Sequence, residues 1–196
     1  MDDIYKTISA PSEGFFKDRL SKFYAFAYPV NNEEQIREIQ KELRKKFHDA
    51  RHHVYAFILG KEKENFRYSD DGEPANSSGP PVLNAIKSFD LTDILVVVIR
   101  YFGGKKLGVP GLINAYRTAA EEALTNAKIL EQQSETTLTL NFEYSQINRV
   151  MYILKKEEIN IISQNFSQSC EIKCSVRDSK FEEIKKFLDN IGVEVK

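Results

Sequence analysis

The sequence contains no tryptophan, two cysteines and six prolines in 196 residues, and its nine glycines follow no period. Such a composition excludes collagen-like and low-complexity chains. Charge excess is also missing, because 28 lysines and arginines nearly balance 29 aspartates and glutamates and leave a net charge of −1. No overall field therefore draws this chain to nucleic acid or to a membrane, and any polyanion must be bound by a local patch.

Long apolar runs and a basic leader are absent as well. The longest apolar run, residues 94–99, is far shorter than the roughly 20 residues of a membrane span. The first residues, Met1-Asp2-Asp3, are acidic where a signal peptide is basic. Cys170 and Cys174 lie on one face of an expected strand, too far apart for a disulfide. We expect a cytoplasmic protein with reduced thiols and no membrane partner; its oligomeric state is left open.

The whole chain is 41% hydrophobic, and its first half reads as mixed α and β structure. Strands are expected at 22–30 and 53–59, flanking a helix capped by Asn31 or Asn32. The β-branched run within residues 93–102 predicts a central strand buried on both faces. Residues 60–81 form a long loop with a possible short strand at 66–68. Helices are expected at 82–88 and from about Pro110.

The C-terminal part has a different organisation. A polar segment at 131–135 precedes a strand at 136–144, a helix opened by Ser145, strands at 159–166 and 169–176, a helix at 180–190 and a strand at 193–195. The order βαββαβ is typical of the ferredoxin-like arrangement. We therefore expect an α+β protein with domains at 1–131 and 135–196.

The sharpest candidate site is the glycine-rich turn after the central strand. No acidic residue occurs between Asp93 and Glu121. Glycine backbones and a following helix N-terminus favour anions, and lysines add point charges. The turn lacks the second half of a P-loop, so a strand-to-helix turn with solvated lysines is the alternative. The candidate anion-binding or nucleic-acid-binding residues are Arg100, Tyr101, Gly103, Gly104, Lys105, Lys106, Asn114 and Arg117, with Phe102 as a further stacking ring.

An acidic loop precedes the central strand, with the residues Ser69, Asp70, Asp71 and Glu73. Its carboxylates could bind a divalent cation or act as an acid–base pair. An Asx-type turn is the favoured interpretation, and a salt bridge to Arg100 or Lys105 is a second alternative.

His48 and His52 are spaced as metal ligands would be on one helix. A helix that ends between them breaks this geometry, so capping or hydrogen bonding is favoured. We expect no metal and no other cofactor, and no catalytic residues are assigned.

The motifs together resemble the YigZ/IMPACT family of translation-associated proteins. The resemblance covers about residues 20–128 and rests on Ser-Asp-Asp-Gly-Glu-Pro at 69–74, on Arg-Tyr-Phe-Gly-Gly-Lys-Lys-Leu-Gly at 100–108, on His-Asp-Ala-Arg-His-His-Val-Tyr-Ala at 48–56 and on Ala115-Tyr116. The chain departs from the family pattern at residues 75–78, which replace Gly-Thr-Ala-Gly. At 110–114 it also loses a glycine and an arginine, whose place Asn114 takes.

The resemblance implies a first domain similar to domain IV of elongation factor G, and a ferredoxin-like second domain similar to domain V. It implies a translation regulator that binds RNA or the ribosome. We expect the protein to be non-enzymatic, and a protein partner in translational control is a further expectation. Two other functions stay open: a metal-assisted hydrolase that uses Asp70, Asp71, Glu73 and one histidine, and a protein-interaction module.

Overall fold

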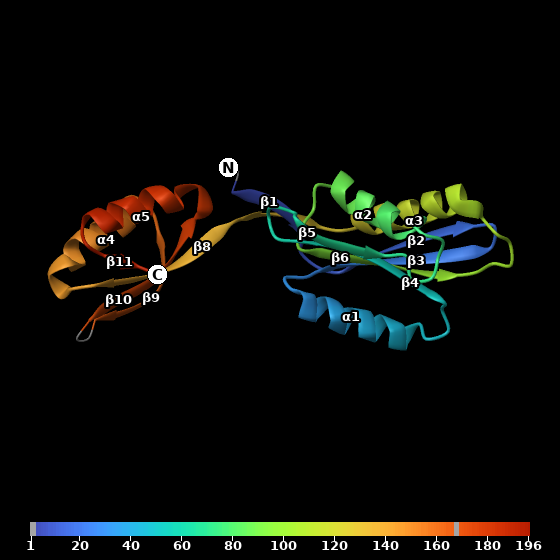
Figure 1. Ribbon diagram of the computed structural model, residues 1–196, viewed down its shortest axis with the longest axis horizontal. Helices are drawn as coiled ribbons and strands as arrows, with labels where there is room; N and C mark the ends of the chain where they lie inside the picture. Colours follow the sequence, from blue (N-terminus) through green and yellow to red (C-terminus); the bar gives the residue numbers. More distant parts are fainter. Residues whose placement is uncertain (1–2, 167–168) are drawn as a thin grey trace. The chain divides into compact units, whose positions relative to one another are not determined.

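The computed structural model describes residues 3–166 and 169–196 and divides into two compact units (Figure 1). The N-terminal unit spans Tyr5–Gln132, and the C-terminal unit comprises residues 133–196 with residues 3–4. Both mix helices and strands. No helix among the described residues is long and apolar enough to cross a membrane.

The N-terminal unit is built on a five-stranded sheet of order β2-β3-β6-β4-β5, in which all neighbours are antiparallel. A separate two-stranded sheet joins β1 and β7. The strands are β1 (Ile4–Ile8), β2 (Ser12–Asp18), β3 (Ser21–Pro29), β4 (His52–Leu59), β5 (Asn65–Ser69), β6 (Ile94–Tyr101) and β7 (Ile129–Gln133). The helices are α1 (Glu33–Lys46), α2 (Gly79–Ser88) and α3 (Gly108–Thr125).

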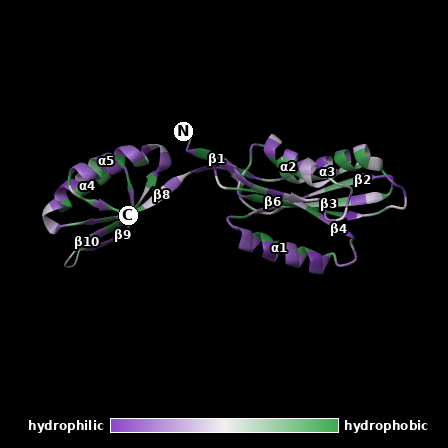
Figure 2. Cartoon of the chain, in the orientation of Figure 1, coloured by the Kyte–Doolittle hydropathy of each residue, from purple (hydrophilic) through white to green (hydrophobic). Residues whose placement is uncertain are grey.

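Helices cover both faces of this sheet. In Figure 1, α2 and α3 lie on one face and α1 on the other. Alternate residues of β6 enter the two cores: Val96 and Val98 pack with α2 and α3, while Leu95 and Val97 pack with α1. The prediction of a central strand buried on both faces is confirmed. Figure 2 shows apolar residues concentrated in the sheet and hydrophilic residues along the outer side of α1.

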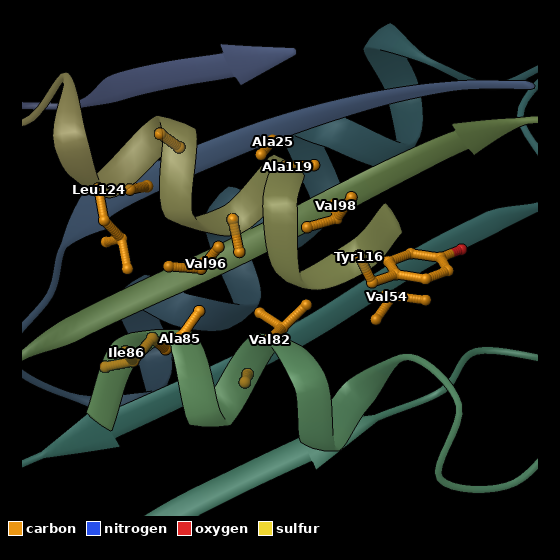
Figure 3. Close-up of a cluster of buried hydrophobic side chains, with 14 of the residues drawn as sticks. Ala25, Val54, Val82, Ala85, Ile86, Val96, Val98, Tyr116, Ala119 and Leu124 are labelled. Carbon is orange, nitrogen blue, oxygen red and sulfur yellow. The ribbon is translucent and has the colours of Figure 1, made fainter. Parts of the chain in front are cut away.

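Small side chains bring α3 close to the sheet. Ala115, Ala119, Ala120 and Ala123 of this helix are fully buried, and Figure 3 shows Ala119 beside Ala25 of β3. Such close approach leaves little room in β2, where a Cβ on Gly14 would stand 2.4 Å from the backbone nitrogen of Ala123.

Two helices of this unit begin where side chains cap them. Asn32 accepts a hydrogen bond from the backbone of Gln35 at the start of α1, as expected for an Asn cap. The second, α2, begins at Gly79, before the expected residue 82. The Asp70 carboxylate accepts hydrogen bonds from the backbone N–H groups of Ser78 and Gly79, at 3.0 and 2.8 Å. This cap from a distant residue extends α2 and carries no local sequence signal.

The C-terminal unit has one four-stranded antiparallel sheet of order β11-β8-β10-β9. Its strands are β8 (Glu135–Phe142), β9 (Asn160–Phe166), β10 (Cys170–Arg177) and β11 (Glu194–Val195), and its α-helices are α4 (Ile147–Lys156) and α5 (Phe181–Asn190). A 3-10 turn with Glu143 as its cap precedes α4, so Ser145 is not the helix cap. Leu140, Ile172, Leu154 and Leu188 form part of the core, and both cysteines are free and buried.

The polar segment at 131–135 is not an irregular linker. Its first residues complete β7, and β8 begins at Glu135. Among the described residues β7 pairs with β1 alone, and it is largely exposed. It therefore carries no apolar alternation that would mark it as a strand.

Candidate functional site

The acidic loop and the glycine-rich turn lie at the same end of the N-terminal sheet. A cavity of about 810 Å³ lies between them, with Glu73 and Pro74 on one side and Lys106 and Leu107 on the other. The end of β6, the start of β4 and the start of α3 complete its wall. The two motifs singled out in the sequence therefore belong to one region.

The link between the motifs is a buried ion pair. The Arg100 Nη1 donates to Glu73 Oε1 at 2.6 Å, and the two side chains are only 7% and 4% exposed. The Tyr116 hydroxyl of α3 donates to the same oxygen at 2.7 Å. Figure 3 shows this hydroxyl pointing away from the aliphatic cluster around Val82 and Ala85. Burial, followed by the Glu73 charge, raises the pKa of Tyr116, which stays a donor at neutral pH.

Arg100 therefore differs from its expected role as an open cation at the turn. Arg100 forms a salt bridge with Glu73, which is the second alternative given above for the acidic loop. Its guanidinium also lies 5.6 Å from the ring of Phe23 and 5.5 Å from that of Phe102. Desolvation explains this arrangement, because an arginine side chain that is only 7% exposed needs an anionic partner.

The other two loop carboxylates stabilise backbone. Asp70 accepts from the backbone N–H groups of Asn76, Ser78 and Gly79 and from the Ser78 hydroxyl. Burial alone raises the pKa of Asp70, but the bonds from Gly79, Ser78 and Asn76 outweigh it and lower the pKa. Ser69 Oγ accepts from the N–H of Asp71 at 3.2 Å, which is the serine counterpart of an Asx turn.

Asp71 connects the loop to α1 and β4. Its carboxylate accepts from Arg44 at 2.8 Å and from the backbone N–H of His53 at 2.6 Å. Burial raises the pKa of Asp71, but the hydrogen bond from Arg44 and that from His53 lower it overall.

The three carboxylates point to different partners and do not converge on one point. Among the residues that the structure describes, no group of three or more His, Cys, Asp or Glu side chains is arranged to hold a metal ion. The carboxylate constellation that a metal-assisted hydrolase would need is therefore not assembled by Asp70, Asp71 and Glu73.

The histidines are also separated. α1 ends at Lys46, before both His48 and His52, and not between them as expected. His48 is exposed in the loop after the helix, whereas His52 begins β4. The Nδ1 of His52 lies 2.9 Å from the carbonyl oxygen of Asp71, so this ring contacts the acidic loop by hydrogen bonding.

The glycine-rich turn keeps its lysines in solvent. Gly104, Lys105 and Lys106 are exposed, and in the described part of the chain no ion pair involves either lysine. Gly103 is different: its N–H donates to Ser21 Oγ at 3.1 Å, and a Cβ there would stand 2.1 Å from the carbonyl carbon of Leu20. Gly103 thus packs against the β2–β3 turn, and its N–H is not open to a ligand.

Tyr101 is likewise engaged within the protein. Its hydroxyl donates to Asp49 Oδ1 at 2.6 Å, which raises the pKa of Tyr101 to about 12. Phe102, in contrast, is 55% exposed, and its ring lies beside the turn with the Arg100 guanidinium 5.5 Å away.

Asn114 and Arg117 are exposed on α3 but lie along the helix, not at its start. At 1.5 Å per residue, Arg117 is about 14 Å along the axis from the first residue of α3. The two side chains extend the polar face of α3 and do not close around the turn.

The β2–β3 hairpin adds cations that the sequence analysis missed. Lys17 and Lys22 are exposed and face each other across the hairpin, and Lys22 pairs with Tyr101 of β6. Arg19 Nη1 lies 3.5 Å from the carbonyl oxygen of Lys106. With Arg51, which lines the same cavity as Lys106, they form what we call the basic end: Lys17, Arg19, Lys22, Arg51, Lys105 and Lys106.

The hairpin was missed because its turn lacks the usual signal. Arg19 and Leu20 both have positive φ, 44° and 71°, a conformation normally taken by Asn-Gly or Asp-Gly in two-residue turns. The sequence pattern that could have indicated the hairpin is the alternation of Gly14 and Phe16 with polar residues in β2, followed by Phe23 in β3.

The chain matches two known family models. Residues 19–124 match the model of the Impact N-terminal domain, and residues 140–192 match a domain of unknown function, DUF1949. The chain belongs to the IMPACT family.

Similar proteins come from bacteria and animals. An IMPACT family member of Haemophilus influenzae is 30% identical over 167 residues, which cover 83% of this chain and 80% of that protein. IMPACT family member YvyE of Bacillus subtilis is 27% identical over 176 residues, which cover 90% of this chain and 81% of YvyE. Protein IMPACT of Xenopus laevis is 38% identical over 96 residues, 46% of this chain and 30% of its own. A solved structure titled as that of a hypothetical protein has a TM-score of 0.74 at 26% identity, covering 100% of this chain and 97% of its own.

Proposed function

We propose that this protein is a non-enzymatic, cytoplasmic regulator associated with translation, and that it binds RNA, including ribosomal RNA, through the basic end. The observation that carries the proposal is the gathering of cations from three separate segments at one end of the N-terminal sheet. The hairpin supplies Lys17, Arg19 and Lys22, the turn supplies Lys105 and Lys106, and the α1–β4 loop supplies Arg51.

Charge and exposure support RNA as the ligand. All six side chains are exposed, and within residues 17–22, 47–51 and 102–107, which carry them, the carboxylates are those of Asp18 and Asp49. Asp49 already accepts a hydrogen bond from Tyr101. The local excess of positive charge suits a phosphate backbone, although the whole chain is nearly neutral. The exposed Phe102 ring offers a surface on which a base can stack.

We propose in addition that the two units are domains near the expected limits of 1–131 and 135–196, with folds similar to domains IV and V of elongation factor G. For the second unit, the element order βαββαβ and the strand order β11-β8-β10-β9 support a ferredoxin-like assignment. The outer face of its sheet carries polar residues such as Thr139 and Lys173, and it would broaden an RNA footprint.

The test is a titration of fluorescent single-stranded and duplex RNA at several salt concentrations. Each phosphate contact contributes a slope of about 0.7 for single strands or 0.9 for duplex in log affinity against log salt. Replacing Lys105 and Lys106 together by Glu is expected to weaken binding of all sequences uniformly and to reduce the slope.

A matched control carries the same charge change at the other end of this unit: Lys87→Glu with Lys128→Glu, two exposed lysines at the end of α2 and after α3. RNA affinity absent even at low salt, or lost equally in both double variants, would contradict the proposal. A protein partner recovered in a pull-down that survives nuclease treatment would favour the interaction-module alternative instead.

A further inference from the structure

The cavity between the acidic loop and the glycine-rich turn has features that RNA backbone binding does not require. Its volume of about 810 Å³ is within the range of small-molecule sites. It is concave, and of the basic end only Arg51 and Lys106 line it among the described residues, whereas Lys17, Arg19, Lys22 and Lys105 lie outside its wall. Its wall divides into a cationic part and an apolar part.

The cationic part contains a buried guanidinium that is not fully used. Arg100 lines the cavity and is only 6% exposed. Its Nη1 donates to Glu73, but its buried Nε has no hydrogen-bond partner. That nitrogen is too buried for a ligand in the cavity to reach, but the positive charge of the guanidinium adds to the potential beside the cavity and favours an anion there.

The start of α3 faces the same space. Gly108, Val109 and Leu112 line the cavity, no side chain caps the helix, and its first turn contains no acidic residue. Pro110 has no N–H, so the donors of the first turn come from the residues around it. An 18-residue helix with an uncapped N-terminus attracts an anion to this position.

Charges around the cavity add to a positive balance. Arg51, Arg100 and Lys106 line it, opposed by Asp49 and Glu73. Because Asp49 is hydrogen-bonded to Tyr101, and Glu73 to Arg100 and Tyr116, both carboxylates already have donors. The remaining positive charge and the helix dipole favour a ligand with a small negative charge.

The apolar part of the wall suits a flat ring. Phe102, Leu107, Val109 and Leu112 come from the turn and the start of α3, beside the anion position. Phe102 is exposed enough to stack on a planar group.

From these observations we infer that the cavity binds a nucleoside 5′-monophosphate group, with the phosphate at Arg100 and the start of α3 and the base against Phe102. The group can come from a free nucleotide or from the phosphorylated 5′ end of an RNA. In the second case the inference rests on the proposed function and makes it more specific, because the cavity would hold the end of the strand.

The test uses isothermal titration calorimetry of the full chain with each of the four nucleoside 5′-monophosphates, with the corresponding nucleosides and with inorganic phosphate. We expect saturable binding with one site for at least one monophosphate, and weaker binding of its nucleoside and of phosphate. Absence of saturable binding, or a nucleoside that binds as tightly as its monophosphate, would overturn the inference.

The informative variant is Val109→Glu, with Val109→Gln as its neutral control. Val109 is 46% exposed, and a carboxylate in the first turn of α3 favours the helix, so the variant should fold. The new charge repels a phosphate in the cavity, and we expect an affinity at least about tenfold lower than in Val109→Gln. Equal affinities in the two variants would overturn the site.

Competition identifies the source of the group and separates this inference from the proposed function. Displacement of the bound nucleotide by a 5′-phosphorylated oligonucleotide, but not by its 5′-hydroxyl form, assigns the cavity to an RNA end. If neither oligonucleotide displaces the bound nucleotide, the site is supported and is assigned to a free nucleotide. RNA affinity that depends on Lys105 and Lys106 without any nucleotide binding would leave the proposed function standing and remove this inference. Nucleotide binding without RNA affinity would support this inference and contradict the proposed function.

Discussion

Glu73 and Arg100 lie 27 residues apart in the chain, yet their side chains meet at 2.6 Å in the interior, each less than a tenth exposed. The pair joins the acidic loop to the end of the central strand. Removing one partner leaves the other as an uncompensated buried charge, which is usually far more costly than the loss of a surface pair.

We therefore expect Glu73→Gln to lower the free energy of unfolding by about 3–5 kcal/mol. Urea denaturation followed by circular dichroism measures this. Glu33→Gln is the control, because its pair with Arg37 is 3.6 Å long and exposed, and should change stability by less than about 1 kcal/mol. Similar effects of both substitutions would show that the buried pair has no special role.

The lowered pKa of Asp70 predicts that the stability of the protein changes with pH in the acidic range. Its folded-state pKa is lowered, so its contribution is complete above the unfolded-state pKa of about 3.9 and is lost as the pH falls through the lower folded-state value. Asp70→Ala removes the cap of α2 and should cost about 1–2 kcal/mol at pH 7. The difference from the unsubstituted protein should shrink as the pH falls below about 4.

Thermal or urea unfolding from pH 7 to pH 2 measures this dependence. Glu64→Ala, at an exposed position just before β5, should follow the unsubstituted protein at every pH. A difference for Asp70→Ala that does not change across this range would contradict the assigned role of the carboxylate.

Gly103 should tolerate no side chain. A Cβ at this position would stand 2.1 Å from the carbonyl carbon of Leu20 and 2.2 Å from the nitrogen of Ser21, both backbone atoms. Gly103→Ala must displace the β2–β3 turn, and we expect a loss of about 1–3 kcal/mol measured by urea denaturation. Lys105→Ala, two residues along the exposed turn, should be nearly neutral for stability.

The hairpin cations should contribute to RNA binding as strongly as those of the turn. If Arg19 and Lys22 each contact a phosphate, replacing both by Ala reduces the salt slope for single-stranded RNA by about 1.4, from 0.7 per contact. The RNA titration described above gives this slope directly. A slope that stays at the value of the unsubstituted protein would remove the hairpin from the interface.

Local patterns predicted the elements whose signals are contained within short stretches of chain. The β-branched run of β6 indicated a strand buried on both faces, and Asn32 indicated the start of α1. The motif residues at 69–74 and 100–108 indicated the family. The hairpin of β2 and β3 escaped because Arg19 and Leu20 take positive φ without glycine or asparagine.

The sequence by itself determined where the buried strand and the amphipathic helices form, and it placed carboxylates and cations in two separate motifs, because hydrophobic periodicity and residue type are local properties. Only the tertiary structure decided how those charges are used. It paired Arg100 with Glu73, used Asp70 to start α2 and brought Arg19 beside Lys106. These outcomes depend on which distant groups are desolvated together when the chain folds. The free energy of pairing such groups is set by contacts across the sheet and not by neighbours along the chain.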